Sequence, residues 1–318
     1  MKYSQLTFEE RYVIQCCRQN EEPQTAIARK LGRHRSTISR ELSRNNSSST
    51  PYKADIAHQE ATERAQRSGS AGKVTTRLWN HVTDRLRQYW SPEQIAAELA
   101  ARDGPDLSHE WIYQLIYADK ASGGNLWKYL RHPRKRRKHH KPNGETRGRI
   151  PDRTSIAERP EIVEEKKRVG DWEIDLVEGA KGSGYLLTLV ERKTSFTLVG
   201  QLSRATAPNV SRVATDLLNP YKDHVHTITC DNGREFAGHT DLAGNLECDV
   251  YFADAYSPWQ RGLNENTNGL LRQFFPNGCD MSQFQAKHLR AAMYLLNHRP
   301  RKTLHFQKPQ LLFARQFP

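Results

Sequence analysis

The sequence predicts a multidomain protein in which an all-α N-terminal region precedes an α/β domain with a mixed sheet of five strands. Through about the first 130 residues, apolar side chains recur at helical spacing and helix caps lie between them. After residue 160 the pattern changes to short runs of β-branched and aromatic residues bounded by turn residues. Runs of strands followed by helices in one segment are typical of a layered α/β or α+β domain.

The charge of the 318-residue chain is unevenly distributed. Residues 1–150 hold 28 Lys and Arg against 16 Asp and Glu, so almost all of the net charge of +13 lies in this part. Such a positive field attracts polyanions, nucleic acid first. A charge that served only solubility would have no reason to be segregated. We therefore expect nucleic acid as the partner.

The composition argues against membrane, disulfide-rich and zinc-binding classes. No apolar run approaches the ~20 residues that a bilayer span needs, and the first residues have no apolar core of a signal peptide. The five cysteines are odd in number and contain no CxxC pair, which predicts reduced, structural thiols. We expect an intracellular protein without a membrane partner.

Residues 1–60 predict a helix-turn-helix domain. Thr7 and Glu10 have the spacing of a capping box, and Phe8, Tyr12 and Cys16 recur at helical spacing after it. Two further helices fit QTAIARKLG and HRSTISRELSRN, with a glycine turn between them. A small solvated bundle is the alternative, but a polar face on the third helix favours DNA. The candidate DNA contacts here are Arg33, Arg35, Ser36, Thr37, Ser39, Arg40 and Arg44.

Residues 61–130 predict a second helical domain, similar to a helix-turn-helix. Ser91 caps a helix with Pro92 at its first position and Gln94 at its third. Ser108 caps a second helix, HEWIYQLIYAD, after a loop longer than a tight turn. Four tryptophans either fill the core of this domain or form a contact between chains: Trp79, Trp90, Trp111 and Trp127.

Residues 131–158 predict a basic linker, since they combine a dense positive run with no apolar periodicity. The segment is either a solvated spacer or a contact along the phosphate backbone, with salt-dependent affinity. The candidate contacts are Arg134, Lys135, Arg136, Arg137 and Lys138.

Residues 159–318 predict the α/β domain. DWEIDLVEGA, GYLLTLVERKT and SFTLVGQL predict three antiparallel strands, and HTITCD and CDVYFAD predict a fourth and a fifth. Helices fit APNVSRVATDLLNPY, GLNENTNGLLRQFF and QFQAKHLRAAMYLLNHRP.

Three carboxylates predict a metal site in this domain. Asp175 lies on the first strand, Asp231 directly after the fourth, and Glu265 in a later helix. In a ribonuclease-H-like sheet the first and fourth strands are neighbours, so the two aspartates can converge and the helix can bring the glutamate across. Oxygen ligands suit hard cations such as Mg²⁺, and two such ions about 3.5–4 Å apart cleave or join phosphodiesters. Separately, Asp231 could cap a turn and Glu265 could be a helix N-terminal acid.

Five ordered motifs resemble the catalytic core of the bacterial insertion-sequence-thirty family of DDE transposases. They are DWEIDLVEG, LLTLVERKTSFTLVG, TCDNGREFAGH, YFADAYSPWQRGLNENTNGLLRQFFPNG and LLNHRPRK, and they cover roughly residues 150–310. The segment LTFEER…IARKLGRHRSTISRELSRN resembles the same family's opening helix-turn-helix. The resemblance places the catalytic Asp, Asp and Glu on Asp175, Asp231 and Glu265. The family's usual His-Trp-Glu-Gly-Asp is replaced by residues 171–175, Asp-Trp-Glu-Ile-Asp, which leaves the roles of Asp171 and Glu173 open.

The resemblance implies an enzyme that binds terminal inverted repeats and catalyses metal-dependent cleavage and strand transfer, with two Mg²⁺ or Mn²⁺ ions per site. It implies double-stranded DNA, as transposon ends and as target, for the partner. It also implies action at the bacterial nucleoid in the cytoplasm and a homodimer or larger assembly. We expect Trp259 and Arg261 to contact DNA near the site, although they could equally anchor a loop. The alternatives are a non-enzymatic helix-turn-helix regulator, which has no need of the three carboxylates, and an integrase or nuclease of the same fold.

Overall fold

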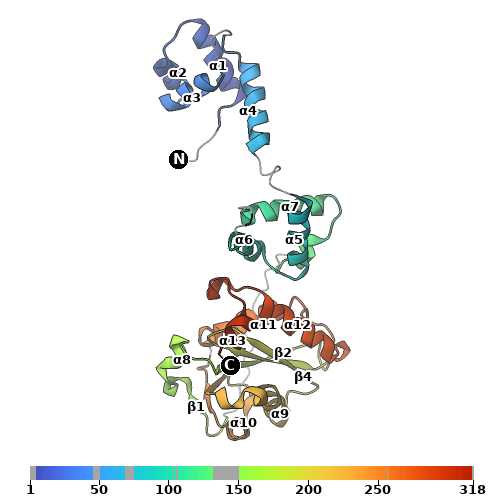
Figure 1. The fold of residues 1–318 in the computed structure, drawn as a ribbon. Helices are drawn as coiled ribbons and strands as arrows, with labels where there is room; N and C mark the ends of the chain where they lie inside the picture. Colours follow the sequence, from blue (N-terminus) through green and yellow to red (C-terminus); the bar gives the residue numbers. More distant parts are fainter. Residues whose placement is uncertain are drawn as a thin grey trace. The chain divides into compact units, whose positions relative to one another are not determined.

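The computed structural model describes residues 5–45, 51–68, 75–102, 104, 107–131, 150–255 and 257–316, with the backbone alone for 65–68 and 258. The chain divides into two compact units, residues 1–79 and 80–318. Figure 1 shows both units as ribbons and labels the α-helices and some of the strands. The candidate DNA contacts at 134–138 lie outside the described residues.

The first unit contains the predicted helix-turn-helix. Thr7 and Glu10 form the expected capping box at the start of the first helix, and Gly32 adopts the left-handed φ of +60° in the turn before the third. The helices are α1 (Phe8–Gln19), α2 (Gln24–Lys30), α3 (Arg35–Asn45) and α4 (Ala54–Ser68).

The buried face of α1 differs from the stripe that its apolar residues suggested. Phe8 and Tyr12 are exposed, whereas α1 buries Arg11, Ile14 and Cys17. The Arg11 guanidinium can be buried because α3 supplies a carboxylate for it, and a buried cation needs such a partner.

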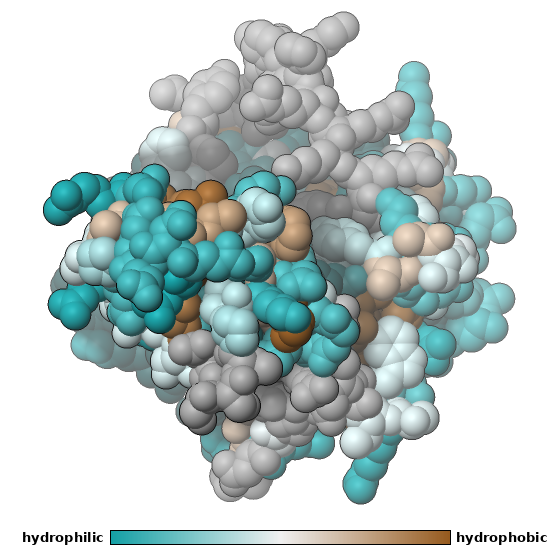
Figure 2. Space-filling view, turned by 90° about the horizontal axis from the view of Figure 1, so that it is seen from above, coloured by the Kyte–Doolittle hydropathy of each residue, from teal (hydrophilic) through white to brown (hydrophobic). Residues whose placement is uncertain are grey.

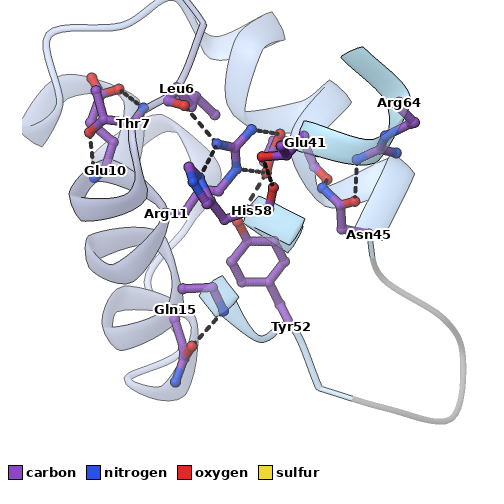
Figure 3. A network of polar contacts seen from close by, with 12 residues as sticks. Leu6, Thr7, Glu10, Arg11, Gln15, Glu41, Asn45, Tyr52, His58 and Arg64 are labelled. Atoms are coloured by element: carbon purple, nitrogen blue, oxygen red, sulfur yellow. Dashed lines mark hydrogen bonds and ion pairs between the residues drawn. The ribbon is translucent and has the colours of Figure 1, made fainter. Parts of the chain in front are cut away.

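Arg11 is the centre of the polar network that ties α1 to α3 (Figure 3). Its Nε donates to Glu41 Oε1 at 2.7 Å, and its Nη1 donates to the Leu6 carbonyl at 2.6 Å. Tyr52, just before α4, donates its hydroxyl to the same Glu41 oxygen at 3.2 Å. One carboxylate therefore fixes the segments on both sides of α3.

The second helical segment has the predicted caps and packs on the C-terminal part of the chain. Ser91 and Gln94 form a capping box, and Ser108 accepts from Trp111 N. The Tyr89 ring lies 4.8 Å from that of Phe274, and Gln94 Nε2 donates to the Pro300 carbonyl at 2.6 Å. The elements are α5 (Thr76–Arg87), α6 (Pro92–Ala100), α7 (His109–Ala121) and the 3-10 helix η2 (Leu126–Tyr129). Of the four tryptophans, Trp90 is buried and Trp79, Trp111 and Trp127 are half-buried.

The sheet has the order β1-β6-β5-β2-β3-β4. Strands β2, β3 and β4 pair antiparallel, and β2, β5, β6 and β1 pair parallel, so the sheet is mixed as predicted. The five expected strands are present, together with a two-residue edge strand that falls in the range assigned to the linker. The strands are β1 (Thr154–Ser155), β2 (Asp171–Glu178), β3 (Tyr185–Glu191), β4 (Thr197–Leu202), β5 (Thr227–Cys230) and β6 (Asp249–Phe252).

Helices cover both faces of this sheet, with α9 and α10 on one side and α11 and α12 on the other (Figure 1). The α-helices are α8 (Glu161–Glu165), α9 (Ala207–Leu218), α10 (His239–Leu246), α11 (Gly262–Leu271), α12 (Ala286–His298) and α13 (Pro309–Ala314). The 3-10 helices are η3 (Ile156–Glu158), η4 (Asn219–His224), η5 (Arg234–Phe236), η6 (Pro258–Arg261), η7 (Met281–Gln283) and η8 (Lys302–Leu304).

Side-chain alternation along β2 decides which residues reach α11. Trp172 and Ile174 pack into the core under α9 and α10, whereas Val177 packs into the core under α11 and α12. Because successive side chains of a strand point to opposite faces, Glu173 and Asp175 share the α11 face with Val177.

The surface is polar, in keeping with the mean hydropathy of −0.83. Figure 2 shows one face on which hydrophilic side chains predominate and hydrophobic areas are small. Within the part of the chain that the structure describes, no helix combines the length and apolarity needed to cross a membrane.

Replacing Arg11 should destabilise the first unit strongly. Arg11→Ala leaves Glu41 buried without its cation, which costs about 3–5 kcal/mol, and hydrogen exchange of the α1–α3 amides in the full chain measures this loss. The control is Lys30→Ala, because Lys30 is exposed and pairs with Glu22 in solvent, where a pair contributes about 0–1 kcal/mol. Equal losses in the two variants would contradict the role of the buried pair.

Candidate active site

Parallel pairing of β2 with β5 brings Asp175 and Asp231 together. Asp171 pairs with Thr227 and Glu173 with Thr229, so the same two-residue step places Asp175 level with Asp231. Both aspartates therefore lie on the α11 face at the end of this ladder. Gly233 N donates to Asp231 Oδ1 at 2.8 Å, which fixes this carboxylate in the turn after β5.

The Arg261 guanidinium lies between the two carboxylates. Its Nη2 is 3.5 Å from Asp175 Oδ1 and 3.4 Å from Asp231 Oδ2, and its Nη1 donates to the Ile174 carbonyl at 2.9 Å. Two carboxylates this close to one nitrogen repel each other unless a cation is present. The site is thus built to hold positive charge, and in this conformation Arg261 provides it.

Burial, more than any neighbour, sets the protonation of Asp175. Its pKa is raised by burial, an effect that Arg261 opposes and the Asp231 charge reinforces. Asn268 Nδ2 donates to Asp175 Oδ2 at 2.8 Å, and Thr188 Oγ1 donates to Asn268 Oδ1 at 2.9 Å. Asn268 therefore orients the carboxylate. Asn268 was not among the residues predicted from the sequence, although it stands seven positions after Arg261 on the same helical stripe.

Glu265 lies on α11 between the two residues that contact Asp175. It follows Arg261 by four positions and precedes Asn268 by three, so the three share one stripe of the helix. Its side chain is exposed. Among the described residues no group of three His, Cys, Asp or Glu side chains is close enough to hold a metal ion. Glu265 thus does not complete a three-carboxylate cluster in this conformation.

The two acids upstream of Asp175 are engaged in ion pairs. Asp171 accepts two bonds of 2.9 Å from Arg168, and Glu173 accepts from Arg192 Nη1 at 2.6 Å. Glu173 Oε2 also accepts from the Asn264 backbone N–H in the first turn of α11, at 3.0 Å. Burial raises the pKa of Glu173, and Arg192 opposes that effect. Glu173 therefore anchors α11 to β2.

Two domain families match parts of the chain. A helix-turn-helix domain matches residues 2–45, and an integrase core domain matches residues 165–258, ending before Arg261 and Glu265. A solved structure of the catalytic core of BIV integrase is similar with a TM-score of 0.37 and 19% identity, over 46% of this chain and 95% of that one.

Insertion-sequence transposases are similar over nearly the whole length. The transposase for insertion sequence element IS4351 of Bacteroides fragilis is 40% identical over 97% of this chain and 95% of its own. The transposase for IS1086 of Cupriavidus metallidurans is 40% identical over 98% of this chain and 95% of its own. Transposase InsI for IS30A of Escherichia coli is 37% identical over 91% of this chain and 78% of its own. The chain belongs to the IS30 family of insertion-sequence transposases.

This transposase is accordingly a DNA-binding, nucleic-acid-cleaving enzyme, built on an integrase core of a kind that generally uses divalent metal ions. Its α3 helix presents most of the predicted DNA contacts to solvent. Arg33 differs, because its Nε donates to Glu10 Oε1 at 2.8 Å. Arg35, Ser39, Arg40 and Arg44 are exposed, and Ser36 and Thr37 are half-buried.

Removing the Arg261 charge should make the folded state depend on divalent metal. Arg261→Gln leaves Asp175 and Asp231 without that cation, so Mg²⁺ should raise the melting temperature of the variant by about 2–4 °C more than that of the wild type. Arg212→Gln is the control, since Arg212 pairs with Asp216 on the exposed face of α9. A Mg²⁺ shift that is the same in the wild type and both variants would contradict a cation site between the aspartates.

Proposed function

We propose that this transposase binds the terminal inverted repeats of a bacterial insertion sequence and cleaves and joins DNA at Asp175, Asp231 and Glu265. The observation that carries the proposal is the convergence of Asp175 and Asp231 on one cation position. The similarity to named insertion-sequence transposases over nearly the whole chain supports the same reading.

The residues present fit divalent metal. Asp175 and Asp231 offer the oxygen ligands that Mg²⁺ or Mn²⁺ prefers, and Glu265 shares a helical stripe with residues that already contact Asp175. Two ions held there would activate a water or a 3′-hydroxyl and stabilise the leaving oxygen of a phosphodiester. Asn268 keeps Asp175 oriented toward that position. Arg261 is then free to contact a DNA phosphate, as the sequence analysis expected.

Recognition of the element ends falls to α3. The proposal assigns base and phosphate contacts to its exposed arginines and hydroxyl residues, and to Arg33 only once its pair with Glu10 opens. Residues 134–138 add affinity without specificity. Trp259 contacts DNA next to the carboxylates.

Each of the three carboxylates should be essential for cleavage and dispensable for binding. Asp175→Ala, Asp231→Ala and Glu265→Ala should each lower Mg²⁺-dependent cleavage by at least about 100-fold, since even partners one shell further out contribute 10–100-fold. Gel-shift assays on end DNA should remain at wild-type affinity. Asp216→Ala on the exposed face of α9 is the control. Any one variant that cleaves near-normally is thereby removed from the site.

Arg40 should read sequence. Arg40→Ala should weaken binding to the terminal repeat by about 1–3 kcal/mol more than binding to random DNA. Arg18→Ala serves as the control, because Arg18 is an exposed cation of the same unit that lies on α1 rather than α3. An equal loss on both DNAs would make Arg40 a phosphate contact alone.

The active form should be a homodimer or larger assembly, because two element ends and a target must be held together and symmetric assembly suits paired sites. Light scattering of the protein on repeat DNA should therefore show paired ends. One chain per end without pairing, at the concentration that supports cleavage, would rule this out.

A further inference from the structure

A cavity of about 850 Å³ lies beside α11, outside the carboxylate site. Its wall includes Gly262, Leu263, Asn266 and Thr267. At 100° per residue these positions occupy one face of α11. Arg261, just before the helix, Glu265 and Asn268 lie on the opposite face, so the cavity and the carboxylates lie on opposite sides of the same helix.

Arg301 is a buried cation in the wall of this cavity. Arg301 as a whole residue is only 7% exposed. Its Nη2 donates to the Leu296 carbonyl at 3.1 Å, while its Nε has no partner among the described residues. Burial lowers its pKa to about 10, with Arg131 adding to that effect, so it is charged at neutral pH.

The absence of an acid beside Arg301 is unusual for a buried charge. Within the described part of the chain no carboxylate forms an ion pair with it. Arg192, in the same wall, shows the contrast, because it pairs with both Glu173 and Glu164. Arg301 therefore has no anionic partner within the described residues, so an anion from outside the protein could pair with it.

The rest of the wall adds two acids, Glu164 and Glu173, both paired with Arg192, and beyond these two further cations and an aromatic surface. Lys166 and Lys193 line the cavity and form no ion pair within the described residues. Trp259 is 75% exposed, the largest exposed fraction among the large hydrophobic side chains that the structure describes. An exposed indole next to unpaired cations matches the two parts of a nucleotide, since a base stacks on an aromatic ring and a phosphate pairs with Arg.

We propose that this cavity binds one unpaired nucleotide of the DNA substrate, with its base on Trp259 and its phosphate on Arg301. The inference rests on the proposed function in taking DNA as the ligand. The volume lies within the range of ligand pockets. A single strand that passes the N-terminal end of α11, where Trp259 and Gln260 lie, reaches both the cavity and the carboxylates. The cavity would thus hold a nucleotide close to the reacting phosphodiester.

The test compares two probes on the full chain without divalent metal. One is a five-nucleotide single strand, and the other is the same sugar-phosphate strand without bases. Loss of the bases should weaken binding to the wild type about ten-fold. Trp259→Ala should weaken binding of the intact strand about ten-fold and should bind both probes equally. Tyr294→Ala, which removes another exposed aromatic side chain, should behave as the wild type.

Two outcomes of this comparison would overturn the proposal. In one, Trp259→Ala and loss of the bases weaken binding independently, so that their effects multiply. In the other, the wild type binds both strands equally and inorganic phosphate displaces both, which makes the cavity a site for free phosphate.

Arg301 gives a second readout. Arg301→Gln should weaken both probes about ten-fold and lower the salt slope of binding by about 1, whereas Lys302→Gln, an exposed neighbour paired with Glu93, should do neither. An unchanged affinity in folded Arg301→Gln overturns the phosphate contact. The Trp259 comparison decides the base contact even where Arg301→Gln does not fold.

Failure of this proposal differs from failure of the proposed function. Both probes bind without metal, so their affinities do not depend on catalysis. If Asp175→Ala still cleaved DNA, the proposed catalytic role would fail while the Trp259 result stood. If Trp259→Ala bound single strands normally, the proposed nucleotide site in the cavity would be refuted. The carboxylate variants would still abolish cleavage.

Discussion

The parallel pairing of β2 with β5 is the constraint on which the site depends. The register of this ladder carries Asp175 and Asp231 to the same level and the same face, and no flexible segment separates either residue from the sheet. Strand ends in a hydrogen-bonded sheet are rigid, so the repulsion between the carboxylates cannot be relieved by moving them apart. A cation between them offsets it, as does a proton on one of them. The fold therefore creates a demand for positive charge before any ligand arrives.

The two neighbouring acids on β2 do not share this need for a cation. Asp171 and Glu173 lie on the same strand face as Asp175, yet each has its own arginine, Arg168 and Arg192. A metal ion would compete poorly for carboxylates that already accept charge-assisted hydrogen bonds from guanidinium groups, the half-buried Arg168 and the buried Arg192. Glu173 also binds the first turn of α11 through Asn264 N, and so sets the position of the helix that carries Glu265. The upstream acids hold β2 and α11 in place, whereas Asp175 and Asp231 share Arg261 as their one cation among the described residues.

The sequence predicts local features of this protein better than its long-range pairings. The capping boxes at Thr7 and Ser91, the five longer strands and the neighbouring first and fourth strands were all readable, because each follows from short-range patterns or from a known sheet order. The burial of Arg11 was not, since it depends on Glu41, 30 residues away, and apolar periodicity instead favoured Phe8 and Tyr12. The bond from Asn268 to Asp175 spans 93 residues and carries no local signal. The strand β1 was missed because two residues are too few to show a period.

Helix α11 lies between a pair of carboxylates with too little positive charge beside them and a buried arginine without an acid beside it in the described part of the chain. On one face Asp175 and Asp231 share the Arg261 guanidinium, and on the other Arg301 is buried and forms no ion pair within the described residues. Arg301 does not pair with the aspartates, because α11 lies between them. A polyanion that arrives with divalent cations supplies both missing charges at once. Substrate and metal should therefore both stabilise the position of α11, because each supplies the charge that is missing on a different side of this helix.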